Sequence, residues 1–352
     1  GGVLAQKQAF FDISIGTGTM VFGLASVILG TQLFHRFGKL KATTAVIAGA
    51  ILYKACVAFV ISMRIVKATD LKLITAAILL LILIVSDSMK RKGHTMLELK
   101  NISKYYNAGT VNEMCLFNDF NLSIDDGEFV SVVGSNGSGK TSMLNLICGS
   151  IPVDSGTIVM GGTDITKMPE YKRQRRIGRV YQHPAMGTCP NMTILENMAL
   201  ADNKGKPFNL LPGTNKARID FYRDQLKILG LGLEDKMGVK VGVLSGGQRQ
   251  AMALLMSTMT PIEFLILDEH TAALDPKTAD IIMELTGKIV AEKHLTTIMV
   301  THNLRFAVEY GNRLLMMHQG HAVMDKKGEE KANTKVDDIL DMFNAISIEC
   351  GN

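Results

Sequence analysis

A glycine-rich stretch that ends in Lys-Thr carries the clearest chemical signal in the sequence. Residues 134–141 read GSNGSGKT, after an apolar run that predicts a strand and before a segment that predicts a helix. Glycines let backbone N–H groups curl around phosphates, and the start of the helix adds its positive end. We expect Lys140 to reach the β- and γ-phosphates of a nucleotide and Thr141 to bind Mg²⁺ through its hydroxyl. The predicted phosphate-binding residues are Gly134, Ser135, Asn136, Gly137, Ser138, Gly139, Lys140, Thr141 and Ser142.

An acidic pair about 130 residues later is the second signal. Asp268 and Glu269 directly follow the apolar residues 264–267, which predict a buried parallel strand. At the end of such a strand, Asp268 is placed to hold Mg²⁺ through water, and Glu269 to polarise an attacking water as a general base. A solvated acidic pair is the structural alternative. The phosphate loop elsewhere in the chain favours catalysis over that alternative.

A third signal, LSGGQ at residues 244–248, opens a predicted helix. A serine and two glycines at a helix N-terminus make a second phosphate site. One nucleotide cannot easily use two such sites in one subunit. We therefore expect Ser245, Gly246, Gly247 and Gln248 to bind the nucleotide of a second copy of the chain. A capped helix with a glycine turn is the alternative.

These motifs and three further ones, VYQHP, TAALD and IMVTHN, make residues 96–352 resemble an ABC transporter ATPase. The resemblance implies ATP and Mg²⁺ as cofactors and ATP hydrolysis as the reaction. It implies that Gln182 joins Mg²⁺ and water to the permease contact and that His302 contacts the γ-phosphate. It also implies that Asp275 ends a loop at the nucleotide.

The fold class that follows from the resemblance is an α/β P-loop NTPase. It would contain a mixed sheet core, an antiparallel β-subdomain and a helical subdomain. The stretch SKYYN resembles the part of the family that stacks an aromatic ring on adenine. Tyr106 would be this aromatic residue, with Tyr105 as the alternative.

Local patterns predict the elements around these motifs. Alternation and turn residues predict strands of an antiparallel sheet at 97–106, 120–134 and 156–166. The sequence Asp-Asp-Gly at 125–127 predicts a hairpin. Residues 183–242 are helix-rich and charged and resemble the helical subdomain of the family, with Thr193 as a candidate helix cap. The C-terminal stretch 318–344 is expected to end in an amphipathic helix.

Three apolar segments precede residue 88. They are 13–34, 42–63 and 71–85, and they approach the length of about 20 apolar residues that a membrane-spanning helix needs. Their Gly, Ala, Ser and Thr residues allow close helix packing in lipid. Three buried helices of a soluble protein are the alternative. Residues 1–88 resemble the C-terminal end of permeases in ABC importers, in particular tryptophan/tyrosine-type importers.

Composition narrows the choice of partners. The net charge of +5 forms no long basic block, so the sequence predicts no nucleic-acid partner. The five cysteines are scattered and odd in number, which favours reduced thiols over a disulfide framework. The first residues, GGVLAQ, show no signal peptide, and we expect a truncated start.

The expected domains are a permease fragment with about three transmembrane helices (1–88), a linker (89–95) and an ABC ATP-binding domain (96–352). The expected function is coupling of ATP hydrolysis to uptake of a small solute, an amino acid, because DEHTAALDPKTAD also resembles ATPases of tryptophan/tyrosine-type importers. The expected partners are a second ATPase copy (a homodimer), membrane permease subunits and a solute-binding protein. The ATPase would lie on the cytoplasmic side of the cytoplasmic membrane. An exporter ATPase and a non-transport ABC ATPase are the alternatives. Because the permease-like residues 1–88 and the ATPase-like residues 96–352 lie in one chain, we also expect a fusion or read-through of two neighbouring genes.

Overall fold

The computed structural model describes residues 95–206 and 213–349, together with Ile51. The chain divides into two compact units, Gly1–Gly93 and His94–Asn352. The three apolar segments predicted to span a membrane lie outside the described residues. Within the described residues, no helix has the length and apolar composition that crossing a membrane requires.

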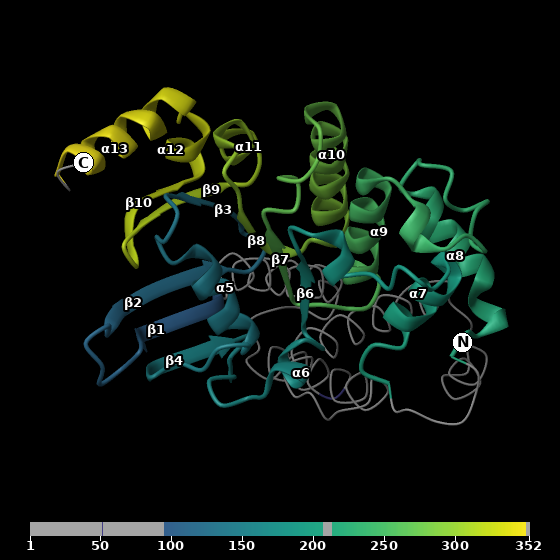
Figure 1. The fold of residues 1–352 in the computed structure, drawn as a ribbon, viewed down its shortest axis with the longest axis horizontal. Coiled ribbons are helices and arrows are strands. Elements are labelled where there is room, and N and C mark those ends of the chain that lie inside the picture. The colour runs from purple at the N-terminus through teal and green to yellow at the C-terminus, as the bar shows by residue number, and fades with distance from the viewer. Residues whose placement is uncertain (1–50, 52–94, 207–212, 350–352) are drawn as a thin grey trace, which may run out of the picture. The chain divides into compact units, whose positions relative to one another are not determined.

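A six-stranded mixed sheet forms the centre of the second unit (Figure 1). Its strands are β3 (Phe129–Gly134), β6 (Ile177–Val180), β7 (Phe264–Asp268), β8 (Thr296–Val300), β9 (Arg313–His318) and β10 (His321–Lys327). The strand order is β10-β9-β3-β8-β7-β6. All neighbours are parallel except β10, which pairs antiparallel with β9 at one edge. The predicted mixed sheet core is confirmed.

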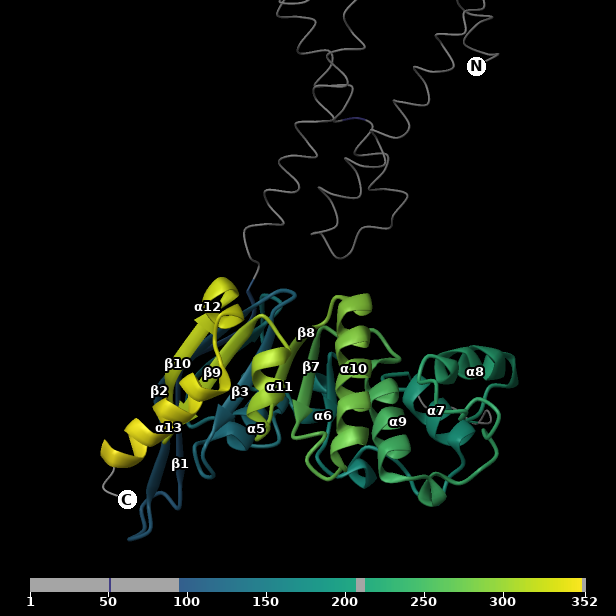
Figure 2. The same cartoon turned by 90° about the horizontal axis from the view of Figure 1, so that it is seen from above.

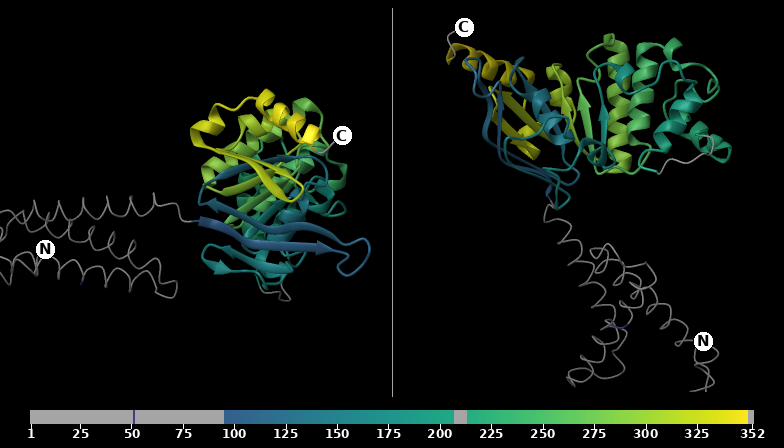
Figure 3. Two further views of the ribbon diagram at one scale, coloured as in Figure 1. Left: turned by 90° about the vertical axis from the view of Figure 1, so that its left-hand side faces the viewer. Right: turned by 60° about the horizontal axis from the view of Figure 1, so that its bottom comes forward.

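A second sheet of four strands is antiparallel throughout. Its strands are β1 (Thr95–Tyr106), β2 (Met114–Asp125), β4 (Ser155–Met160) and β5 (Thr163–Asp164), in the order β2-β1-β4-β5. The long blue strands in Figure 3 belong to this sheet. The prediction of an antiparallel sheet is confirmed for 97–106, 156–166 and the part of 120–134 that lies in β2, whereas residues 129–134 belong to the central sheet.

The predicted hairpin at residues 125–127 is wrong. β2 pairs with β1, whereas β3 pairs with β8 and β9, so the turn leads from one sheet into the other. The turn itself is present, because Glu128 N donates to Asp125 O at 3.0 Å and Gly127 has a φ of +75°. β3 is buried at every position, which is typical of an interior strand of a parallel sheet. The turn residues specify the reversal of the chain but not the partner of the next strand.

The two largest of three apolar cores lie on opposite faces of the central sheet. On one face, α5 (Lys140–Cys148) packs between the two sheets, in a core with Phe264 and Ile266. On the other face, α9 (Gly246–Thr258) and α10 (Pro276–Lys293) share a core with Leu265 and Leu267. The alternate side chains of β7 therefore serve opposite cores, as the period of a strand requires.

Among its described residues, the predicted helical subdomain contains two short α-helices. Its helices are α7 (Ile194–Asp202) and α8 (Ile219–Lys227), with 3₁₀ turns at 184–186, 216–218 and 241–243. Thr193 caps α7 as predicted, since its hydroxyl accepts from Glu196 N at 3.2 Å. α7 and α8 lie at the end of the unit opposite β1 and β2 (Figures 1 and 2). The remaining helices of the described residues are α6 (Glu170–Arg173), α11 (Leu304–Glu309), α12 (Gly328–Ala332) and α13 (Val336–Glu349), the last confirming the predicted tail helix.

Candidate nucleotide-binding and catalytic site

The carboxyl ends of β3, β7 and β8 meet at one edge of the central sheet. Val132 of β3 and Asp268 of β7 are both in register with Val300 of β8. The glycine loop follows β3, the acidic pair follows the apolar part of β7, and His302 lies two residues beyond β8. Residues that are far apart in the sequence are thus brought to the edge where parallel sheets bind ligands.

The phosphate loop is shaped by glycines at positions that no other residue could occupy unchanged. Gly134 has a φ of +155°, and a Cβ there would lie 2.3 Å from Met317 O. Gly139 has a φ of +101°, and its Cβ would lie 3.0 Å from the ring of Phe117. The loop therefore runs close to β9 and β2 and then enters α5, whose free N–H groups face the loop end.

Lys140 is held inside this loop by neutral acceptors. Its Nζ donates to Gly134 O at 2.7 Å and to Ser135 O at 2.9 Å, and the side chain is buried. Burial lowers the pKa of the Lys140 ammonium, and the charge of Glu269 opposes this shift. A carbonyl group carries no net charge, so the loop holds a cation that a phosphate could neutralise.

Glu269 and His302 form a close pair beside the loop. His302 Nε2 lies 2.8 Å from Glu269 Oε1. The Glu269 side chain is 16% exposed and that of His302 is 47% exposed, so the pair joins the interior to solvent. Glu269 has a φ of +48°, and its N–H donates to Val300 O at 2.9 Å. The structure thus brings together the Lys140 loop, the acidic pair and His302.

The serine–glycine motif belongs to a different group of residues. Ser245 caps α9, with its hydroxyl accepting from Gln248 N and Gln248 Oε1 accepting from Ser245 N, both at 3.2 Å. A Cβ on Gly246 would lie 3.5 Å from Leu274. A Cβ on Gly247 would lie 2.3 Å from Cγ2 of Thr278. The motif therefore packs against Leu274 of the TAALD stretch and Thr278 of α10.

The two groups lie apart within one chain. α5 and α9 are separated by β7 and β8 in both views (Figures 1 and 2). Among the described residues, no hydrogen bond or ion pair joins 245–248 to the phosphate loop. Asp275 stays with the second group, where it caps α10 by accepting from Thr278 N at 3.1 Å.

Tyr106 and Gln182 flank the first group. The Tyr106 hydroxyl donates to Ser142 Oγ at 3.4 Å, which places its half-buried ring beside the start of α5. Tyr105 points to the other face of β1 and is exposed, so Tyr106 is the better placed of the two. Gln182 is exposed just beyond the end of β6.

The residues predicted to hold Mg²⁺ offer the right kind of atom. Thr141 contributes a hydroxyl, Asp268 a carboxylate and Gln182 an amide carbonyl, and Mg²⁺ prefers oxygen ligands. In the part of the chain that the structure describes, no group of three or more His, Cys, Asp or Glu residues could hold a metal ion alone. Such a sparse set fits a cation that takes its other ligands from phosphate and water.

Comparison with known proteins places the chain in a family. The ABC transporter family profile matches residues 117–272. The chain is 47% identical over 248 residues to the tyrosine transport ATP-binding protein of Clostridioides difficile, covering 70% of this chain and 98% of that protein. The chain belongs to the ABC transporter family.

Further relatives agree with this assignment. The chain is 29% identical over 255 residues to the phosphonates import ATP-binding protein PhnC of Lactococcus lactis, covering 69% of this chain and 98% of that protein. A solved structure, the ATP-binding cassette MJ0796 as a dimer in a post-hydrolysis state bound to ADP and Pi, matches with a TM-score of 0.57 and 30% identity. It covers 66% of this chain and 98% of that one. The chain is thus an ATP-binding and ATP-hydrolysing subunit of the ABC import type.

The contacts of two residues of this ABC ATPase, Arg179 and His270, were not predicted from the sequence. Arg179 of β6 donates from Nη2 to Asp268 Oδ2 at 2.7 Å. The sequence shows a charged residue inside the apolar stretch IGRV, where its side chain would be buried. A buried charge needs a partner, so a contact of Arg179 with a carboxylate could have been expected. His270 follows the acidic pair but is buried, and burial lowers its pKa to about 4. His270 Nε2 lies within hydrogen-bond distance of Thr286 Oγ1, at 3.2 Å, which is a structural contact.

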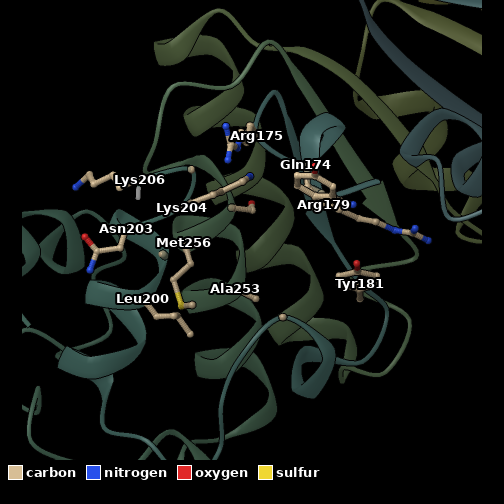
Figure 4. A pocket seen from close by; sticks show the side chains of 15 residues that line it. Gln174, Arg175, Arg179, Tyr181, Leu200, Asn203, Lys204, Lys206, Ala253 and Met256 are labelled. Carbon is tan, nitrogen blue, oxygen red and sulfur yellow. The ribbon is translucent and has the colours of Figure 1, made fainter. Parts of the chain in front are cut away.

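A basic pocket lies on the outer side of β6, facing α7 and α9 (Figure 4). Its volume is about 450 Å³, and it has Leu200 and Met256 among its apolar residues. None of its lining residues is acidic. Lys204 Nζ donates only to a carbonyl, Ile177 O at 2.9 Å, and burial lowers the Lys204 pKa to about 8. The ABC ATPase therefore presents a pocket that combines apolar surface with positive charge.

Proposed function

We propose that this ABC ATPase drives import of tyrosine or a similar aromatic amino acid through a membrane permease. The observation that carries the catalytic part is the meeting of the Lys140 loop, Asp268 and Glu269 at one sheet edge, with His302 2.8 Å from Glu269. The choice of solute is supported by the 47% identity with the tyrosine transport ATP-binding protein.

Each residue at the sheet edge has a proposed role. Lys140 neutralises the β- and γ-phosphates, since its present partners are uncharged carbonyls. Glu269 accepts a proton from the attacking water, and His302 holds the γ-phosphate on the exposed side of the pair. Tyr106, next to Ser142, stacks on the adenine ring.

Mg²⁺ would be held by Thr141, Asp268 and Gln182, together with phosphate oxygens. When bound, the cation supplies charge neutralisation at the phosphates. Thr141 is the first residue after Lys140 in α5, so the loop positions the hydroxyl and the cationic side chain together.

A second copy of the chain completes each nucleotide site in this proposal. The helix cap at Ser245 and the loop at Asp275 pack together but lie away from the phosphate loop of their own chain. A head-to-tail pair of copies would place Ser245 and Gly247 of one copy on the nucleotide of the other. The relative solved as a dimer supports this arrangement.

The pocket beside β6 is the proposed contact for the permease. Its wall includes Tyr181, the residue before Gln182. Arg175 and Lys204 have no acidic partner among the described residues. A permease segment with an apolar side chain next to a carboxylate would match this surface.

The N-terminal region is proposed to belong to such a permease. Residues 1–88 would supply its C-terminal part with about three transmembrane helices, and 89–95 would link it to the ATPase. This proposal is supported by the three apolar segments. It places the ATPase on the cytoplasmic face of the membrane, with a solute-binding protein on the other side.

Uptake of labelled tyrosine tests the proposal. Cells that make this chain together with a permease and a binding protein should accumulate tyrosine, and Lys140→Ala should abolish the uptake. Lys227→Ala, an exposed lysine on α8, is the matched control and should change nothing. Accumulation of a different amino acid would overturn the assigned solute, and ATP-driven efflux would overturn import.

A further inference from the structure

The Arg179 side chain, on β6, connects β7 and α5 at the catalytic edge of the sheet. Its Nη2 donates to Asp268 Oδ2 at 2.7 Å, and its Nη1 donates to Asn145 Oδ1 at 2.9 Å. Asp268 ends β7, whereas Asn145 lies in α5, the helix that follows the phosphate loop. One guanidinium group therefore ties the carboxylate to the phosphate-binding helix.

This contact is buried and directional. The Arg179 side chain is 7% exposed and that of Asp268 is 13% exposed. The guanidinium carbon lies 4.7 Å from the centre of the Tyr181 ring, which limits its sideways motion. Arg179 uses one oxygen of Asp268, and within the described residues the other oxygen, Oδ1, has no hydrogen-bond partner.

A carboxylate that binds Arg179 through one oxygen can bind a cation through the other. The guanidinium is itself held by Asn145 and the Tyr181 ring, so its single hydrogen bond to Oδ2 restrains the direction of the other oxygen. Partners that orient a ligand in this way typically change metal affinity or activity by about 10- to 100-fold when they are removed. A free carboxylate at the same place would rotate, and it would also be left as a buried charge without a partner.

We propose that Arg179 is a positioning residue for the divalent cation. It aims Asp268 and fixes the spacing between β7 and α5, so that the Asp268 carboxylate and the Thr141 hydroxyl can serve one cation. The inference rests on the proposed role of Asp268 in Mg²⁺ binding. Tyr181 stacks on Arg179 and precedes Gln182, so the same group also ties the exposed Gln182 turn to the carboxylate.

A second arginine–carboxylate pair, next to the same two strands, provides a control. Arg176 Nε donates to Glu263 Oε1 at 2.6 Å, just before β6 and β7 begin. This pair joins the same strands at their opposite ends. Arg176→Met removes an arginine–carboxylate contact that is more exposed and uses both carboxylate oxygens, and it does so without touching the catalytic edge.

Binding of Mn²⁺ tests the proposal without relying on turnover. The full chain is titrated with Mn²⁺ in the presence of a non-hydrolysable ATP analogue, and free Mn²⁺ is followed by electron paramagnetic resonance. Arg179→Met should weaken Mn²⁺ binding about tenfold, as expected for loss of an orienting partner. Arg176→Met should match the unmodified chain, and binding of the analogue without metal should be the same in all variants.

The conservative variant keeps the test decisive. Arg179→Lys retains the charge but cannot reach Asp268 and Asn145 with a planar fork, so it should also weaken Mn²⁺ binding, and it serves if Arg179→Met does not fold. Unchanged or tighter Mn²⁺ binding in the folded Arg179 variants would overturn the positioning role. If the unmodified chain itself bound no Mn²⁺ with the analogue, the proposed Mg²⁺ site would fail instead.

Discussion

Removal of the Ser245 hydroxyl separates a helix cap from a nucleotide contact. Ser245→Ala deletes the acceptor for Gln248 N, a hydrogen bond of 3.2 Å. Loss of such a cap costs about 1 kcal/mol of folding free energy. For a folded unit of this size, that loss lowers the melting temperature by about 2–4 °C.

Thr193→Ala is the matched control because it removes the same local contact elsewhere. Thr193 caps α7 with a capping box to Glu196, as Ser245 caps α9 with a capping box to Gln248. The hydroxyl-to-backbone distance is 3.2 Å in both. The two variants should therefore lose similar stability, measured by thermal unfolding of the full chain.

ATP hydrolysis distinguishes the two variants. A hydrogen bond from Ser245 to a phosphate of the other copy's nucleotide would contribute about 1.5–3 kcal/mol, because one partner is charged. Ser245→Ala should then lower kcat/KM for ATP about 10- to 100-fold, since each 1.4 kcal/mol is a factor of ten. Thr193→Ala should leave kcat/KM nearly unchanged. Equal hydrolysis rates in both variants would show that Ser245 is only a cap.

Three further changes have definite expected outcomes. Glu269→Gln should retain ATP binding and lose about 10²- to 10⁴-fold in kcat, as measured by phosphate release, because the amide cannot take a proton from water. Gly247→Ala should cost about 1–3 kcal/mol in denaturant unfolding, because its Cβ would meet Thr278 at 2.3 Å. Burial raises the pKa of Cys148 to about 11, so its thiol should resist iodoacetamide at pH 8 while exposed Cys115 reacts, as peptide mass spectrometry would show. Fast labelling of Cys148 in the folded chain would contradict this environment.

The parts of the site that depend on short-range chemistry could be predicted from the sequence. The phosphate loop, the apolar strand before Asp268 and the caps at Thr193 and Ser245 each depend on residues within a few positions of one another. Local sterics and hydrogen bonds fix such features whatever the rest of the chain does. The mixed sheet was expected only through the family resemblance.

The parts that depend on distant partners could not be predicted in this way. The turn at residues 125–127 was visible, yet nothing local states that β3 joins β8 rather than β2. The contact between Arg179 and Asp268 spans 89 positions in the chain. A buried arginine in an apolar strand needs a charged or hydrogen-bonding partner, but the sequence does not identify which of several carboxylates that partner is.

The positive φ of Glu269 directs the two carboxylates of the acidic pair, Asp268 and Glu269, to different neighbours. Asp268 is the last residue of β7, and its carboxylate accepts a hydrogen bond from Arg179. Continuing the strand would send the next side chain to the opposite face. Instead, Glu269 takes a φ of +48°, a conformation costing about 1 kcal/mol or more, and its N–H is fixed by Val300 O. The strained turn puts the Glu269 carboxylate 2.8 Å from His302, beyond β8, which fits the separate roles proposed for the two adjacent acids.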